Sequence, residues 1–204
     1  MITSIIIKLF YIIIIILFLI GLFVPMIIIK KKGNDPHGTH ESASLLTRLT
    51  SFTIFSWLLY IIAYIVMDVA ISRFLAIDVL SSNVIIIIGF IIVSFGLLLD
   101  GWGTIALGSN FRIELPKEEI SLTTTGIYGL MRNPIVMGVY LLLLGSFLII
   151  PTVISLIFLI TNVITFDSKI RDEEKFLSRQ FGDTYKEYKI KVGRYLPFKL
   201  SKRE

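Results

Sequence analysis

Five long apolar segments dominate this chain of 204 residues and limit what it can fold into. An α-helix needs about 20 apolar residues to cross the hydrocarbon core of a bilayer. The segments that meet or approach this length are 5–29, 50–71, 84–99, 134–150 and 152–166. Lipid offers no partner for an open sheet edge, so their isoleucine-rich runs favour helices over strands. With 55% hydrophobic residues, the sequence predicts an all-α integral membrane protein.

The apolar block 134–166 is too long for one span and is interrupted by Pro151. Proline ends or kinks a helix because it lacks a backbone N–H and its ring clashes with the preceding turn. We therefore expect a helical hairpin, which forms the last two of five transmembrane helices. A cytoplasmic C-terminal helical tail follows the hairpin.

The distribution of basic residues indicates the orientation, because lysine and arginine are enriched in cytoplasmic loops. Five spans with the N-terminus outside place every strongly basic segment in the cytoplasm. A four-span alternative, with one kinked helix over 134–166, leaves the basic tail on the opposite side. The basic residues are Lys30, Lys31, Lys32 and Arg48 after the first span, Arg112, Lys117 and Arg132 after the third, and a rich set in the tail from 169 to 203.

Composition excludes several classes of function. The chain has no cysteine, so disulfides and cysteine-ligated zinc are excluded. The net charge is +5, and the basic residues lie next to apolar spans, where they can contact anionic lipid headgroups. We therefore expect no nucleic-acid partner. His37 and His40 lie in a turn-rich loop, so we expect no metal site. Gly101, Gly103 and Gly108 lack the βαβ unit of a nucleotide-binding loop and indicate a helix exit or close packing.

Polar residues gather at the start of the fourth span, in the stretch 126–145, which reads GIYGLMRNPIVMGVYLLLLG. Proline is tolerated in the first helical turn because its missing N–H would have no partner there. The free N–H groups just after Pro134 form a partial positive end that suits an anionic group. The sequence thus predicts a polar binding site at the edge of the membrane.

Lys169 and Glu173 lie one helical turn apart if the fifth span continues into the tail, on the face that also holds Asn162 and Phe166. A lysine that precedes a glutamate by one turn is the weaker orientation for a helical ion pair. We therefore expect each of the two charges to have its own partner. A solvated helix end that only anchors the span is the alternative interpretation.

Several motifs occur in order in the second half of the chain: GIYGLMRNPIVMG, an acidic pair, FG-x-x-Y-x-x-Y and a closing V-x-R-x-L-P. Together they resemble the isoprenylcysteine carboxyl methyltransferases and the related membrane phospholipid methyltransferases. The resemblance covers residues 96–198, roughly half of the chain. The apolar runs predict that residues 1–99 form three N-terminal transmembrane helices with their loops, the first two of which carry no signature of the family. The resemblance implies that 100–204 bind S-adenosylmethionine without a Rossmann domain and carry catalysis.

The resemblance also implies roles for individual residues. Lys169 and Arg171 are candidates for catalytic contact with a substrate carboxylate, and Glu173 is expected to hold the amino group of the cofactor. Asn133 stands where the family has histidine, and its amide still forms hydrogen bonds. Val136 stands where the family has tyrosine and cannot do so. The full set expected to bind the cofactor is Ile120, Ser121, Leu122, Thr123, Tyr128, Arg132, Asn133, Pro134, Ile135, Val136, Glu173 and Glu174.

The function that the resemblance implies is methyl transfer from S-adenosylmethionine to a lipidic or prenylated carboxylate, at a site facing the cytoplasm of a prokaryotic cell. A carboxylate is ionised at neutral pH, so methyl transfer needs in-line placement more than a base. Lys169 and Arg171 would repel an ammonium group, which weakly favours a carboxylate acceptor. A lipid-amine N-methyltransferase and a non-catalytic lipid-binding membrane protein remain open. The expected partners are membrane lipids and the small lipidic substrate.

Overall fold

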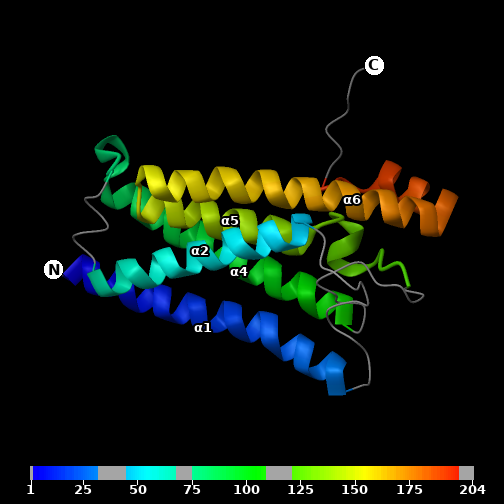
Figure 1. The fold of residues 1–204 in the computed structure, drawn as a ribbon, viewed down its shortest axis with the longest axis horizontal. Coiled ribbons are helices and arrows are strands. Elements are labelled where there is room, and N and C mark those ends of the chain that lie inside the picture. Colours follow the sequence, from blue (N-terminus) through cyan, green and yellow to red (C-terminus); the bar gives the residue numbers. More distant parts are fainter. Residues whose placement is uncertain (1, 32–44, 68–74, 109–120, 198–204) are drawn as a thin grey trace.

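The chain folds into a bundle of long helices in a computed structural model that describes residues 2–31, 45–67, 75–108 and 121–197 (Figure 1). Within these ranges there is no β-strand, and two isolated bridges are the only extended pairing. The elements are α1 (Ile2–Lys31), α2 (Leu45–Met67), α4 (Asn83–Leu107), α5 (Pro134–Ile149) and α6 (Val153–Lys191), with 3-10 turns η1 (Asp78–Leu80) and η3 (Gly126–Gly129). Ile120, His37 and His40 lie outside the described residues.

Four of these helices, α1, α2, α4 and α6, are long and apolar enough to cross a membrane, and α5 is a shorter apolar helix of 16 residues. The predicted all-α, multi-pass membrane fold is therefore confirmed. The arrangement of five spans with the N-terminus outside stays a prediction. Figure 1 shows the helices running along one long axis, with α4 and α5 inside the bundle and α1 at one edge.

Helix α4 is longer than the sequence predicts, because it continues through residues 100–107 instead of ending at 99. It ends at Gly108, whose φ of +52° suits a residue without a side chain. Gly103 does not break the helix. A Cβ there would lie 3.1 Å from the backbone nitrogen of Ile135, so this glycine lets the start of α5 pack directly on α4. Close packing, not helix exit, explains the glycine at 103.

A ladder of glycines holds α4 against α5. A Cβ on Gly138 would lie 2.7 Å from the carbonyl oxygen of Gly96, and a Cβ on Gly145 would lie 2.7 Å from that of Gly89. Small residues let helix backbones approach closely, which strengthens van der Waals packing where lipid weakens the hydrophobic drive for association. Val93, between the two rungs on α4, is fully buried. The short helix α5 is thus fixed by its backbone contact with α4.

The predicted hairpin is present, with its turn at Ile150, Pro151 and Thr152. Thr152 caps α6: its hydroxyl accepts a hydrogen bond from the Ser155 N–H, and the Ser155 hydroxyl accepts one from the Thr152 N–H. The Thr152 hydroxyl also lies 2.7 Å from the Tyr60 hydroxyl of α2. These bonds satisfy polar groups at the end of the bundle opposite to Tyr128.

Helix α6 runs on for 39 residues, well past the apolar block, as the interpretation of the tail requires. Deep in the bundle, the buried Asn162 accepts a hydrogen bond of 2.9 Å from the Thr53 hydroxyl of α2. Further along, Gly182 adopts a φ of +52° and kinks the helix. Because of this kink, the chain after 182 turns back and brings residues 192–195 beside the Arg-Asn-Pro stretch.

Candidate functional site

The Arg-Asn-Pro stretch is bonded to the end of the described chain. The Arg132 N–H donates to the Gly193 carbonyl oxygen at 2.9 Å, and the Asn133 N–H donates to that of Arg194 at 3.1 Å. The Asn133 side-chain amide donates to the same Arg194 oxygen at 3.3 Å. The start of α5 is therefore held by a segment 61 residues later in the chain, just after α6 ends.

A buried carboxylate lies between two arginines at this junction. Arg132 Nη2 lies 2.7 Å from Glu174 Oε1, and Arg194 Nη2 lies 2.6 Å from Glu174 Oε2. Arg132 also donates to the Val192 carbonyl oxygen. Burial alone would raise the pKa of Glu174, but the hydrogen bonds and charges of Arg194 and Arg132 lower it. We call Arg132, Glu174 and Arg194 the arginine clamp.

Asp167 extends the clamp toward the membrane. Its carboxylate accepts hydrogen bonds from the Tyr195 hydroxyl at 2.8 Å and from Arg171 Nε at 2.7 Å, and Arg194 lies 3.4 Å away. Burial opposes ionisation, but the hydrogen bonds from Arg171 and Tyr195 and the charges of the two arginines lower the pKa of Asp167. The Tyr195 hydroxyl is also 3.5 Å from that of Tyr140 on α5. These contacts join α5, α6 and the last described segment.

Lys169 and Glu173 lie on a different side of α6 from the clamp. Lys169 Nζ is 3.6 Å from Glu173 Oε1, so the two charges contact each other despite the weaker order of lysine before glutamate, and a separate partner for each stays a prediction. The side chain of Glu173 keeps 31% of its surface exposed. The protein packed around its carboxyl group nevertheless raises its pKa, and the neighbouring Lys169 only partly opposes this.

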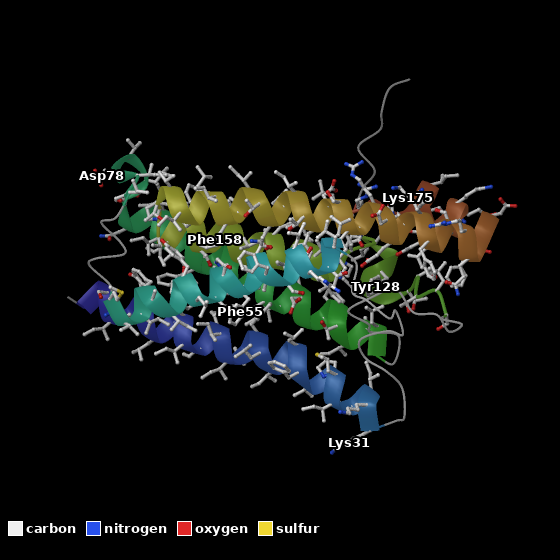
Figure 2. All side chains as sticks on the ribbon, in the orientation of Figure 1. Lys31, Phe55, Asp78, Tyr128, Phe158 and Lys175 are labelled. Atoms are coloured by element: carbon white, nitrogen blue, oxygen red, sulfur yellow. The ribbon has the colours of Figure 1, made fainter. Side chains whose placement is uncertain are left out.

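Tyr128 of η3 lies between α4 and the tail. Its hydroxyl donates to the Gly103 carbonyl oxygen at 3.4 Å, and its own carbonyl oxygen accepts a bond of 2.6 Å from the Tyr188 hydroxyl. Burial, followed by the nearby Tyr188, Asp100 and Glu173, raises the pKa of Tyr128. Figure 2 shows Tyr128 at the end of the bundle that also carries Lys175, opposite to Asp78.

The structure brings most, but not all, of the sequence-predicted residues to this end. Arg132, Asn133 and Glu174 meet in or beside the arginine clamp, and Tyr128, Lys169 and Glu173 lie next to it. The guanidinium of Arg171 is directed elsewhere: its side chain is 61% exposed and pairs with Asp167, not with Lys169 or Glu173. Sequence reasoning on individual residues missed Arg194 and Tyr195, although both lie within the closing V-x-R-x-L-P motif.

The remaining predicted residues line the surroundings of Tyr128 and the start of α5. Pro134 is fully buried and, with Ile135, packs on Gly103 of α4. Val136 is buried at 9% exposure and offers no hydroxyl. Ser121 is exposed and Thr123 is half-buried, while Leu122 packs against the tyrosines at 185 and 188 of the tail.

The two adjacent glutamates differ in what they can bind. Glu174 is engaged on both oxygens by arginines. Glu173 has the single ammonium of Lys169 beside it and remains partly exposed. Glu173 is therefore the member of the acidic pair with capacity for a further cation, whereas Glu174 holds the site together.

Residues 84–184 match the family model described as phospholipid methyltransferase. A protein-S-isoprenylcysteine O-methyltransferase of Xenopus laevis is 32% identical over 116 residues, which cover 55% of this chain and 40% of the relative. One of Saccharomyces cerevisiae is 38% identical over 78 residues, which cover 38% of this chain and 33% of the relative. The chain thus spans less than half the length of these relatives.

A solved structure of the eukaryotic intramembrane Ras methyltransferase ICMT (isoprenylcysteine carboxyl methyltransferase) matches with a TM-score of 0.67. The match covers 96% of this chain and 68% of that chain at 22% sequence identity, so it shows a shared fold. The family match includes α4, η3, α5 and the part of α6 that carries Glu173 and Glu174. The chain therefore belongs to the phospholipid methyltransferase family of membrane proteins.

Proposed function

We propose that this protein is an S-adenosylmethionine-dependent membrane methyltransferase that acts on a lipidic or prenylated carboxylate. Membership of the family supports methyl transfer, and the names of the curated relatives favour an isoprenylcysteine-like carboxylate as the acceptor. The observation that carries the proposal is the difference between the two adjacent glutamates. Glu174 is paired with two arginines, whereas Glu173, near Tyr128, is available for a cationic ligand.

The residues at this end of the bundle fit the cofactor. S-adenosylmethionine supplies an electrophilic methyl group on a sulfonium and also carries an ammonium and a carboxylate. Glu173 would hold the ammonium, because its partly exposed carboxylate gains a second cation there. The segment 121–123, Tyr128 and the residues at the start of α5 would enclose the remainder. The arginine clamp would keep the two walls, α5 and α6, at a fixed separation.

Lys169 is the favoured residue for the acceptor carboxylate, since its ammonium lies beside Glu173, whereas Arg171 faces outward. A lysine can bind two carboxylates, because its ammonium has three donors. Holding the acceptor at this position both orients it and removes water from it. An already ionised nucleophile in this setting needs no general base.

Product chemistry tests the proposal against the amine alternative. The purified protein is incubated with cofactor labelled in the methyl group and with one of two probes, a farnesylated cysteine with a blocked amine and a free carboxylate, or a long-chain primary amine. We expect label in the first probe, released as methanol by base. Base-stable label in the amine probe would establish the N-methyltransferase alternative. Absence of S-adenosylhomocysteine binding in calorimetry would refute the enzyme proposal altogether.

We also propose that the site faces the cytoplasm, because the basic tail lies at the same end of the bundle. The absence of native cysteine allows a clean labelling test. Asp78→Cys and Lys175→Cys lie at opposite ends of the bundle (Figure 2). A membrane-impermeant maleimide should label Asp78→Cys in intact cells and Lys175→Cys only after permeabilisation. The reverse pattern contradicts the proposed orientation.

A further inference from the structure

Asp100 is the only acidic residue in the described helices α1, α2, α4 and α5. It lies in the part of α4 that the sequence did not predict to be helical, and only 7% of its surface is exposed. An ionisable side chain at membrane depth is costly and usually has a function. Neither the arginine clamp nor the Lys169–Glu173 pair uses this residue.

The part of the chain that the structure describes gives Asp100 no counter-charge. Its backbone nitrogen would lie 2.7 Å from a Cβ on Gly138, so α5 packs directly on the Asp100 backbone. Its Oδ2 would lie 3.7 Å from a Cβ on Gly21, so the carboxyl group is directed to α1 at a residue that has no side chain. Among the described residues, none donates a hydrogen bond to this carboxyl group or forms an ion pair with it.

Asp100 is nevertheless close to the candidate site. Gly103, one helical turn later on α4, accepts the hydrogen bond of the Tyr128 hydroxyl. The electrostatic environment of Tyr128 includes both Asp100 and Glu173. Asp100 therefore lies one helical turn further into the apolar bundle than the residue that binds the Tyr128 hydroxyl.

We propose that Asp100, carrying its proton, donates a hydrogen bond to the carboxylate of the lipidic acceptor. A carboxyl group buried without a cationic partner is stable as the neutral acid, and that form has one O–H donor. A hydrogen bond from a neutral acid to a carboxylate is short and strong. This inference rests on the proposed function, since it assigns a ligand to the acceptor side of that site.

The hydrogen bond goes to the acceptor oxygen that does not attack. In the transfer, the other oxygen forms a bond to the methyl carbon, the carbon–sulfur bond breaks, and the sulfur keeps the electron pair. Asp100 retains its proton throughout, so the reaction needs no base. The role of Asp100 is to orient the acceptor and to replace water around it.

The test compares Asp100→Asn and Asp100→Ala in full-length protein, with Asp172→Asn as the control. Asp172 is an exposed residue of α6 that pairs with Lys175. The readout is the Kd for the farnesylated, amine-blocked cysteine, measured by calorimetry in the presence of S-adenosylhomocysteine. Asn keeps a donor at the same place, so we expect its Kd to stay within about threefold of wild type, whereas Ala should weaken binding about 10- to 100-fold.

Each outcome decides the inference. Wild-type affinity in Asp100→Ala would overturn it, because the acceptor would not depend on this side chain. Equal loss in Asn and Ala would also overturn it, because a neutral hydrogen-bond donor at this position would then not support acceptor binding. Both variants should bind S-adenosylhomocysteine as wild type does and melt at a similar temperature. Failure of the wild-type protein to bind S-adenosylhomocysteine would instead refute the proposed function itself.

Discussion

Removal of the Glu174 carboxylate should be among the most damaging single changes outside the apolar core. In Glu174→Ala the guanidinium of Arg132, whose side chain is 9% exposed, loses the carboxylate that lies 2.7 Å away. Breaking a buried ion pair by removing one partner costs about 3–5 kcal/mol, because the remaining charge stays buried without compensation. Arg194 is 27% exposed and can reach water and Asp167, so its share of the loss is smaller.

Reversible unfolding in detergent measures this cost. We expect Glu174→Ala to lose about 3–5 kcal/mol and Arg194→Ala about 1–2 kcal/mol. The matched control is Glu187→Ala, which removes an exposed glutamate paired with Lys191 at 3.8 Å and should change stability by less than about 0.5 kcal/mol. A double-mutant cycle between Glu174→Ala and Arg132→Ala should give a coupling of more than about 1 kcal/mol.

The pH dependence gives an independent check with a definite sign. Because the arginines lower the folded-state pKa of Glu174 below its usual 4.5, the clamp contributes stability that is fully present above that value. This stability is lost as the pH falls through the lowered pKa. Glu174→Gln should therefore flatten the acid limb of the stability curve. A variant as stable as wild type at neutral pH, with an unchanged acid limb, would refute the clamp as a stabilising element.

Three further changes test the site and the fold. Glu173→Gln should weaken S-adenosylhomocysteine binding at least tenfold in calorimetry, because the ligand ammonium loses a charged partner; unchanged affinity counts against the proposed pocket. Lys169→Ala combined with Arg171→Ala should keep cofactor binding but abolish methyl transfer, and retained turnover would remove their substrate role. Gly96→Ala places a Cβ 2.8 Å from a carbonyl oxygen of α5 and should cost about 1–3 kcal/mol, whereas Gly101→Ala, with nothing within 4 Å, should be neutral or stabilising.

The helices and the hairpin could be predicted because a backbone in lipid must satisfy its own hydrogen bonds, which restricts a membrane span to a helix or a closed barrel. The apolar runs and Pro151 mark where helices cross and turn, and the structure agrees. The extension of α4 through Gly101 and Gly103 was missed because glycines near the end of an apolar run look like a helix exit. The packing of Gly103 depends on Pro134 and Ile135 of α5, which come much later in the sequence, so only the three-dimensional arrangement shows it.

Helix geometry distinguishes the two candidates for the acceptor carboxylate. Arg171 is two residues from Lys169, so on a helix the two side chains diverge by about 200°, and only one of them can face Tyr128. The structure has Lys169 beside Glu173, and an exposed Arg171 paired with Asp167. The part played by Arg194 could not be derived in this way, because its place beside Glu174 depends on the kink at Gly182 and the return of the chain.

Glu173 and Glu174 are adjacent on α6, yet their side chains contact different residues. Glu173 and Glu174 differ by about 100° around α6, which is enough to direct one toward Tyr128 and the other toward Arg132 and Arg194. Their surroundings move their pKa values in opposite directions, raised for Glu173 and lowered for Glu174. The arginines of the fold therefore stabilise the ionised form of Glu174. The ionised form of Glu173 would be stabilised further by the binding of another cation. A ligand ammonium at Glu173 would thus supply a second cation beside a carboxylate that Lys169 only partly stabilises.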